Sequence, residues 1–500
     1  MITFTKTQKE GDEHDRYFAA YGYPLSSSIM LVLATVFSHL WPLIFVALVP
    51  LFLNFFTVHK VRKIIFSVLI VGVPYSLAVG WSLFHLSGTW WINDGGIPNA
   101  VNTLGYVVFI FLILFFGQAF YIIPMLVASK IKSLIIPTPL LLGLLFALVE
   151  FIRSSVFVAG YSWGALGYLL VDAWLVKHIA SLFSVYGLTF VIILCNAWIA
   201  SLMRRYVKND GDTVHRLKNS LAVQHTRETI MLMSLFIAIL LFGAYRESRP
   251  IRNELNLRVA VIASQISTPE SINESAYNTY RSLFMQALKD DPNIILTPEN
   301  IFPYFTINEE GYVLARWQST YLPNAQKLYE DFLSLTRAYP HTTFAISAHS
   351  EKNTLLYNSI LLYRDGTVLS VYHKRRPVPF SEYEPLGLDL PLFENLAKGD
   401  KRQNFRLDGM PLAGYVCSEI GITPLTTHGA KLILSPSNDS VFGGNQILLL
   451  HHRIARMRAL ENGAYLLRST KGGISSIINP YGNAIATMSG QNGVFIVDIP

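Results

Sequence analysis

The first half of this chain is dominated by long apolar runs that contain almost no charge, and these runs restrict the folds open to it. About 20 such residues are needed to cross a lipid bilayer as a helix. With a mean hydropathy of +0.37 and 15% charged residues, the chain is too apolar for an ordinary water-soluble protein. The charge density becomes normal after about residue 247. We therefore expect a polytopic membrane domain over residues 1–247 and a water-soluble domain over residues 248–500.

The apolar segments indicate about seven membrane spans. Residues 24–58 form one nearly continuous apolar stretch, divided only by His39, Trp41 and Pro42. We interpret this stretch as a tight hairpin of two spans, with a single long span as the alternative. The expected spans are residues 24–39, 41–58, 64–84, 101–127, 134–151, 181–203 and 229–245.

Lysine and arginine gather in alternate loops, which predicts the orientation of the spans. Basic residues precede the first span and occupy loops at 60–63, 130–132 and 204–227, whereas the loop at 86–100 has Asp94 and no basic residue. The positive-inside rule therefore puts the amino terminus in the cytoplasm, and seven spans put everything after Tyr245 on the exported side. We expect no cleavable signal peptide, because the first residues are polar and mixed in charge. The basic loops account for most of the net charge of +7, so no nucleic-acid partner is expected.

From Leu257 onward, short β-rich runs alternate with amphipathic stretches. Strands that alternate with helices predict a layered α/β domain. The expected strands are residues 257–263, 294–297, 343–348, 359–363, 412–416, 431–435 and 494–500, and the expected helices are 280–288, 323–339 and 451–462.

Two chemically useful side chains come directly after expected strands. Glu299 follows the strand at 294–297 and Cys417 follows the strand at 412–416. Ligand-binding and catalytic groups gather at such carboxyl ends in α/β folds. A proline-interrupted loop at 371–385 carries Lys374 and Glu382. The other cysteine, Cys195, lies in an apolar run, so we expect no disulfide and a free thiol in an oxidising compartment.

These residue types suit a reaction with a cysteine nucleophile. A thiol is a poor nucleophile while it is protonated, so Cys417 needs a base, and Glu299 is the candidate. Attack on an ester carbonyl develops an oxyanion, which the ammonium of Lys374 can stabilise while it also favours the thiolate.

An ordered set of segments surrounds these residues. The set comprises Pro298-Glu299, His373-Lys374, the run from Val378 to Tyr383, the run from Tyr415 to Glu419, and residues 357–359, 437–439 and 456–461. It resembles the triad segments of the nitrilase superfamily and, within it, the bacterial apolipoprotein N-acyltransferases. The resemblance implies an αββα sandwich for the exported domain, with Cys417 as nucleophile, Glu299 as general base and Lys374 as oxyanion stabiliser. It also implies that Glu382 holds Lys374 or orients the substrate, and that Glu419 belongs to the site.

The resemblance further implies the reaction and its setting. Members of that family move an acyl chain from a phospholipid onto the cysteine, and then to the amine of a lipoprotein's diacylglyceryl-cysteine. The expected location is the bacterial inner membrane, with the catalytic domain in the periplasm. The expected partners are a phospholipid donor, an apolipoprotein acceptor and the membrane, with no cofactor and no metal.

The membrane half carries a second part of the resemblance. Residues 150–153 and 156–168 are similar to the family's signature before its sixth span, and they contain Arg153 and Trp163. Both side chains are expected at the membrane face, where they would contact lipid head groups. The alternative is a basic flank and an interfacial aromatic anchor.

The chain departs from the family's pattern at four places. Thr297, Ser418 and Val441 stand where the family usually has an aromatic residue, so the acyl pocket is expected to differ in shape. The family also has a last span after the nitrilase-like domain, whereas this sequence stops at Pro500 after the strand at 494–500. We therefore expect the carboxyl terminus to remain exported.

Two other functions stay open at this point. One is a paralogous membrane N-acyltransferase with a different amine acceptor. The other is a non-catalytic protein that binds lipid or lipoprotein, although such a protein has no need of Glu299, Lys374 and Cys417 together. His451 and His452 are adjacent on an expected helix and point to different faces, so we do not expect them to hold zinc.

Overall fold

A computed structural model describes residues 21–57, 60–80, 121–131, 136–156, 162–208, 217–251, 255–266, 274–302, 305–315, 322–378, 382–383, 395–422, 427–442 and 444–500. The chain forms two compact units. The first consists of Met1–Arg153 and Ser162–Arg249, and the second of Ser154–Tyr161 and Pro250–Pro500. The last helix of the first unit, α9 (Leu217–Glu247), ends close to the change of unit.

The first unit is helical and apolar. Five described helices are long and apolar enough to cross a membrane, namely Ser38–Thr57, Val61–Val79, Thr138–Ser155, Val176–Arg204 and Thr226–Glu247. Two shorter apolar helices are also described. Tyr23–Val36 overlaps the first predicted span, and Tyr121–Lys130 overlaps the fourth. Most of the fourth predicted span, residues 101–120, lies outside the described residues. The described helices are those of a multi-pass membrane protein.

The apolar stretch at residues 24–58 folds back on itself. Helix α2 (Tyr23–Val36) ends where Phe37 takes an extended conformation, and the 3-10 helix η2 (Ser38–Phe45) and α3 (Val49–Thr57) follow. The N–H of Leu51 donates a hydrogen bond to Ser27 Oγ at 2.9 Å across 24 residues, which places α3 beside α2. The stretch therefore turns back at Phe37 as a hairpin would, and within it only Ser38–Thr57 is long and apolar enough to cross a membrane by itself.

A side chain from another helix satisfies the backbone at the junction between η2 and α3. Asn196 belongs to α8 (Ala180–Lys208). Its Oδ1 accepts a hydrogen bond from Leu48 N–H at 2.8 Å, and its Nδ2 donates to the carbonyl of Ile44 at 2.8 Å. Lipid offers no hydrogen-bond partners, so irregular backbone persists in a membrane domain only where protein groups satisfy it.

The second unit contains fourteen described strands. They are β1 (Leu257–Ala263), β2 (Ile294–Leu296), β3 (Phe305–Asn308), β4 (Val313–Ala315), β5 (Thr343–Lys352), β6 (Leu355–Arg364), β7 (Thr367–His373), β8 (Arg406–Leu407), β9 (Met410–Gly414), β10 (Leu432–Asn438), β11 (Tyr465–Lys471), β12 (Ser475–Ile478), β13 (Ala484–Met488) and β14 (Gly493–Ile499).

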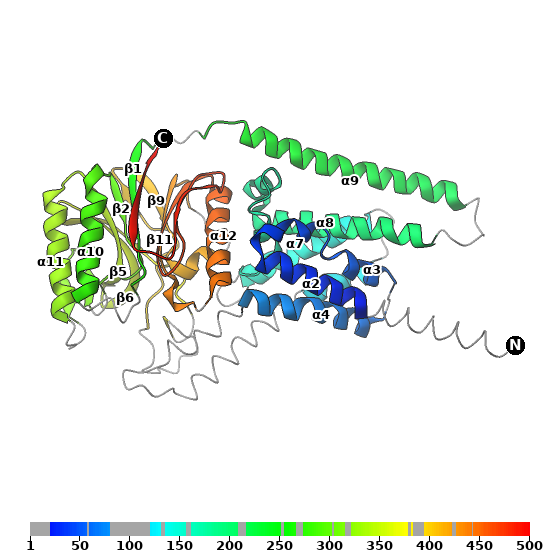
Figure 1. Ribbon diagram of the computed structural model, residues 1–500, viewed down its shortest axis with the longest axis horizontal. Helices are drawn as coiled ribbons and strands as arrows, with labels where there is room; N and C mark the ends of the chain where they lie inside the picture. The colour runs from blue at the N-terminus through cyan, green and yellow to red at the C-terminus, as the bar shows by residue number, and fades with distance from the viewer. Residues whose placement is uncertain are drawn as a thin grey trace, which may run out of the picture. The chain divides into compact units, whose positions relative to one another are not determined.

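These strands form two sheets that pack face to face. One sheet has the order β14-β1-β2-β5-β3-β4, and β6 and β7 extend it from β5. The other has the order β13-β12-β11-β10-β9-β8. Helices α10 (Glu274–Ala287) and α11 (Leu322–Ala338) cover the outer face of the first sheet, and α12 (Asn445–Asn462) lies on the opposite side of the strands (Figure 1). This arrangement confirms the predicted αββα sandwich.

Strand β1 illustrates why the sequence forms these layers. Val259 and Val261 belong to the apolar cluster between the two sheets, while Ala260 and Ile262 belong to the cluster beneath α10 and α11. Successive side chains of a strand point to opposite faces, so a strand buried on both faces reads as a continuous apolar run. The pairs β1–β2, β2–β5, β9–β10 and β10–β11 are parallel. Their carboxyl ends therefore gather at one edge of each sheet, where polar side chains can meet.

Candidate active site

Cys417 lies just beyond β9, at the start of the short 3-10 helix η8 (Cys417–Gly421). Its φ is +52°, which is an unfavourable backbone conformation for a residue with a side chain. Such strain persists only where the surroundings hold it, and it is common at active sites. The turn thus presents a half-buried thiol at the end of a buried strand.

Glu419 holds this turn through hydrogen bonds to its backbone and to neighbouring residues. Its carboxylate is fully buried and accepts hydrogen bonds from the Val416 N–H at 3.1 Å, the Tyr372 hydroxyl at 2.9 Å and the Arg375 N–H at 2.9 Å. Burial raises the pKa of Glu419, and the nearby Arg375 guanidinium opposes that shift. Because Arg375 follows Lys374, Glu419 ties the cysteine turn to the lysine segment.

Lys374 follows β7 and is 1% exposed. Its Nζ lies 2.9 Å and 2.8 Å from the two carboxylate oxygens of Glu382. Burial works against the charged ammonium, but Glu382, Glu299 and Cys417 outweigh it and raise the pKa of Lys374. The pKa of Glu382 is lowered, because Lys374 and its hydrogen-bond donors outweigh the effect of burial. The two side chains therefore form a charged pair at neutral pH.

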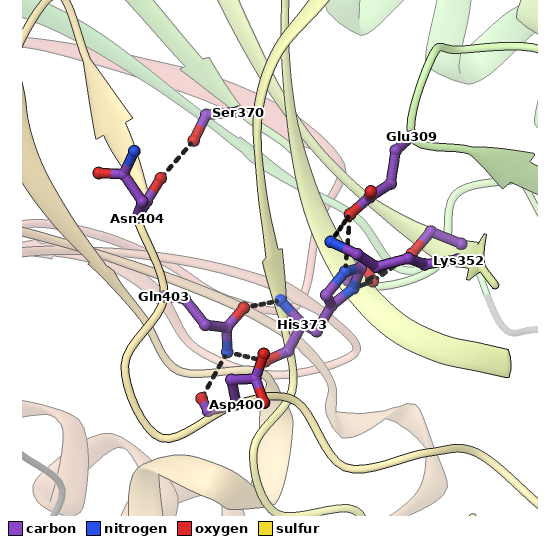
Figure 2. Close-up of polar contacts among 9 residues, drawn as sticks. Glu309, Lys352, Ser370, His373, Asp400, Gln403 and Asn404 are labelled. Atoms are coloured by element: carbon purple, nitrogen blue, oxygen red, sulfur yellow. Dashed lines mark hydrogen bonds and ion pairs between the residues drawn. The ribbon is translucent and has the colours of Figure 1, made fainter.

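The residue before Lys374 is fixed on both its backbone and its side chain (Figure 2). Gln403 accepts a hydrogen bond from the His373 N–H at 2.7 Å and donates to the His373 carbonyl at 2.6 Å. The imidazole Nε2 of His373 lies 3.1 Å from Glu309 Oε1, and Lys352 donates to the same oxygen at 3.0 Å. These contacts make the end of β7 a rigid support for Lys374. They also correct the prediction of a loop from residue 371, since residues 371–373 still pair with β6.

Glu299 follows β2 and is 7% exposed. Its Oε1 accepts a hydrogen bond from Asn358 Nδ2 at 2.7 Å, and its Oε2 accepts one from the Asn438 N–H at 2.7 Å. Asn358 Nδ2 also donates to Glu382 Oε1 at 2.9 Å. One amide group therefore bridges the two carboxylates.

The pKa of the Cys417 thiol depends on its burial and on the charges around it. Burial raises its pKa to about 12, the charges of Glu299 and Asp439 add to the shift, and Lys374 and a hydrogen bond with Ser437 oppose it. The resting thiol is therefore protonated at neutral pH. A nucleophile in this state needs a base, and the carboxylate of Glu299 is the charge that acts on it most strongly.

Sequence reasoning missed two polar residues of this site. Asn358 received no role, although it is a buried polar residue within the apolar strand β6. Lys471, at the end of β11, is fully buried and donates to the Asn300 carbonyl at 2.7 Å. Burial lowers the pKa of Lys471 to about 8, opposed by the charge of Glu299. Both residues could have been noticed in the sequence, because each is a polar side chain at a strand position where an apolar one is expected.

The predicted head-group residues belong to the first unit. Arg153, in the last turn of α7 (Thr138–Val156), is 7% exposed, and its guanidinium lies 5.6 Å from the ring centre of Tyr121. Within the described part of the chain, its Nε and Nη2 have no hydrogen-bond partner. Glu150, one turn earlier, instead accepts from Tyr121 at 2.7 Å and Thr189 at 2.5 Å. Trp163 is also buried, at 6% exposure.

The bridging amide of Asn358 leads to a first prediction. We expect Asn358→Ala to slow acylation of the thiol by about 10- to 100-fold, because two carboxylates lose the donor that orients them. Asn358→Asp should be slower still, since it adds a third negative charge. Single-turnover acylation rates measure both effects, with Asn278→Ala on the exposed side of α10 as the matched control. A wild-type rate in Asn358→Ala would show that this bridge does not orient the site.

Comparison with known proteins gives matches over both units. Residues 27–198 match the family model described as the apolipoprotein N-acyltransferase N-terminal domain, and residues 258–500 match the model described as carbon-nitrogen hydrolase. A protein of Aquifex aeolicus named apolipoprotein N-acyltransferase is 24% identical over 454 residues, covering 87% of this chain and 92% of that protein. A protein of the same name from Rhodopseudomonas palustris is 26% identical over 467 residues, covering 86% and 81%.

Proposed function

The chain belongs to the apolipoprotein N-acyltransferase family, and on that premise we propose that it acylates the amino terminus of apolipoproteins through a thioester on Cys417. The donor is a membrane phospholipid, and the acceptor amine is that of a diacylglyceryl-cysteine. The observation that carries the proposal is the half-buried thiol of Cys417 itself. It is coupled electrostatically to Glu299 and Lys374, in a chain whose other unit has apolar membrane helices.

The first half-reaction loads the acyl chain. Glu299 takes the proton of the Cys417 thiol, and the thiolate attacks the ester carbonyl of the phospholipid. The ammonium of Lys374 stabilises the oxyanion that develops on the carbonyl oxygen. When the tetrahedral intermediate collapses, the C–O bond breaks, and the leaving lysophospholipid oxygen takes the proton back from Glu299. The products are a lysophospholipid with a free hydroxyl group and an acyl thioester on Cys417.

The second half-reaction consumes the thioester. The free amine of the acceptor attacks the thioester carbonyl, and Lys374 again stabilises the oxyanion. Glu299 takes a proton from the attacking nitrogen. The C–S bond then breaks, and Glu299 returns this proton to the departing thiolate of Cys417. An amide replaces the thioester, and the enzyme returns to its starting state. Water has to be kept from the thioester for transfer to outrun hydrolysis.

The pairing of Lys374 with Glu382 suits both steps. Glu382 and Glu299 raise the pKa of Lys374, so the lysine stays charged at every pH at which the thiol reacts. Glu382 is in turn fixed by the Asn358 amide and by the Val378 N–H at 2.6 Å. The positive charge is therefore already in place when the oxyanion forms, so little reorganisation opposes the reaction.

Arg153 and Trp163 are proposed to contact the lipid head group. A buried guanidinium whose Nε and Nη2 have no hydrogen-bond partner among the described residues can take a phosphate by charge-assisted hydrogen bonds. A charged residue in an apolar helix usually marks a site of function, because its burial is costly.

The proposed location is the bacterial inner membrane, with the second unit on the periplasmic side. We expect alkaline phosphatase fused after Pro500 to be active, because the distribution of basic loops puts the region after α9 outside. The same reporter fused after Lys208, in the most basic loop region, should be inactive. Enzyme activity in cells carrying each fusion measures the result. The reverse pattern would mean that the number of spans is wrong.

The direct test of function is transfer to an amine. The purified full-length protein is incubated with phospholipid carrying a labelled acyl chain and with a diacylglyceryl-cysteine lipopeptide. We expect the label to appear in an amide at the peptide's amino terminus. Acylation of the protein followed by transfer only to a different amine would favour the paralogous N-acyltransferase. A protein that binds phospholipid but takes no label would instead be a binding protein.

A further inference from the structure

A fully buried cluster of polar side chains lies behind the nucleophile. Its members are Asp439, at the start of the 3-10 helix η9 (Asp439–Val441), His451 on α12 and Arg468 on β11. Arg468 Nη2 donates to Asp439 Oδ2 at 2.7 Å, and Ser437 Oγ donates to Asp439 Oδ1 at 2.6 Å. None of these side chains has a role in the proton transfers described above.

The contacts of His451 determine which of its nitrogens carries the proton. Its Nε2 lies 3.2 Å from the Cys417 carbonyl oxygen, which can only accept, so Nε2 is the donor. Its Nδ1 lies 2.9 Å from Arg468 Nη2, which can only donate, so Nδ1 is the acceptor. Nδ1 is also 3.0 Å from Oδ1 of Asp439, whose carboxylate accepts hydrogen bonds from Arg468 Nη2 and Ser437 Oγ. The only tautomer that satisfies both directional contacts is the neutral ring with its hydrogen on Nε2.

The electrostatic surroundings agree with an uncharged ring. Burial and the adjacent Arg468 lower the pKa of His451, and the attraction of Asp439 only partly opposes them. Asp439 itself is ionised, because Arg468 and the hydrogen bond from Ser437 lower its pKa despite burial. The negative charge of Asp439 is therefore matched by Arg468, and His451 is left to act as a neutral donor.

The hydrogen bond from His451 fixes the orientation of one peptide. Cys417 has a φ of +52°, so the peptide between Cys417 and Ser418 leaves the strand in a strained direction. A trans peptide is planar, with its C=O and its N–H pointing in opposite directions. Because the Cys417 carbonyl is held toward His451, the Ser418 N–H of the same peptide points away from the buried cluster.

We propose that His451, held as its Nε2–H tautomer by Arg468, which Asp439 orients, is a positioning residue for the acyl transfer. By pinning the Cys417 carbonyl, it keeps the thiol and the Ser418 N–H oriented for a reacting carbonyl. His451 exchanges no proton during the reaction. The inference rests on the proposed thioester chemistry but needs no particular acyl donor.

Two substitutions separate this role from simple packing. In His451→Gln the side-chain amide nitrogen can reach the place of Nε2 and donate to the Cys417 carbonyl. In His451→Asn the amide reaches only the place of Nδ1, so that donor is lost. His452→Asn is the matched control, because it makes the same change one residue along α12, and no described contact joins His452 to Cys417.

The experiment measures acylation of Cys417 by phospholipid and by a short-chain p-nitrophenyl ester. We expect His451→Asn to lower the maximal acylation rate by about 10- to 100-fold with little change in half-saturation. His451→Gln should recover most of that rate, and His452→Asn should match the wild type. A wild-type protein that reacts only with the p-nitrophenyl ester would overturn the proposed donor while leaving the role of His451 testable. Equal rates in the two His451 variants, whether high or low, would overturn the positioning role.

A measurement on the unaltered protein gives a check that does not depend on the activity of the variants. The ¹⁵N spectrum of histidine-labelled protein reports the tautomer of each ring, and His451→Gln identifies which signals belong to His451. We expect a neutral ring with the hydrogen on Nε2 at pH 7. An imidazolium, or a ring with its hydrogen on Nδ1, would contradict the proposal.

Discussion

Replacing Cys417 with alanine lowers acyl transfer to the lipopeptide by about 10⁴-fold or more, because no neighbouring side chain replaces the nucleophile. The hydroxyl of Ser437 interacts with the thiol, but it donates its hydrogen bond to Asp439, a carboxylate that is already paired with Arg468. Cys417→Ser should be nearly as inactive, since a hydroxyl is much harder to ionise than a thiol. Labelled acyl transfer by purified variants measures the loss.

The second cysteine provides the control for this prediction. Cys195 lies in α8 of the membrane unit, so Cys195→Ala should retain activity and still insert into the membrane. Insertion of Cys417→Ala at the wild-type level shows that its loss is chemical. Turnover by Cys417→Ala above the background rate would exclude a covalent route through this residue.

Glu299→Gln and Lys374→Met should both slow acylation strongly but respond to pH in different ways. Glu299→Gln removes the base, so its rate should climb as rising pH ionises the thiol without help. The thiol pKa of about 12 also falls in this variant, because the charge of Glu299 helps to raise it. Partial rescue by alkali is therefore expected below that pKa.

Lys374→Met is expected to lose about 10²- to 10³-fold in rate, comparable to the loss of one oxyanion donor. Alkali should not restore it. Removing Lys374 takes away a charge that lowers the thiol pKa, and hydroxide supplies no positive charge near the carbonyl. Single-turnover acylation rates from pH 6 to pH 10 distinguish the two variants. Rescue of the methionine variant but not of the glutamine variant would mean that the assigned roles are reversed.

Much of the second unit could be predicted because its strands are buried on both faces. The apolar run at 257–263 coincides with β1, and the positions of Glu299 and Cys417 after strands followed from the same pattern. Strand β7 was missed because only its last two side chains are buried, and residues 371–373 were therefore predicted as loop. In the membrane unit, the break around Phe37 followed from His39, Trp41 and Pro42.

The contacts between distant segments could not be predicted. Asn358 meets Glu299 across 59 residues, and His451 meets the Cys417 carbonyl across 34. No local pattern encodes such pairings, because they depend on how the strands order themselves in the two sheets. From the sequence, His451 could be considered only as a possible metal ligand. The positioning role proposed for it depends on the residues packed around it.

The central claim is that Cys417 carries the acyl chain, and mass spectrometry tests it most directly. Wild-type protein is incubated with phospholipid of a single acyl composition, without acceptor, and then analysed intact and after digestion. We predict a mass increase of one acyl chain, located on the peptide that contains Cys417 and removed by neutral hydroxylamine. An unmodified Cys417 peptide, or an adduct that resists hydroxylamine or persists in Cys417→Ala, would contradict the account.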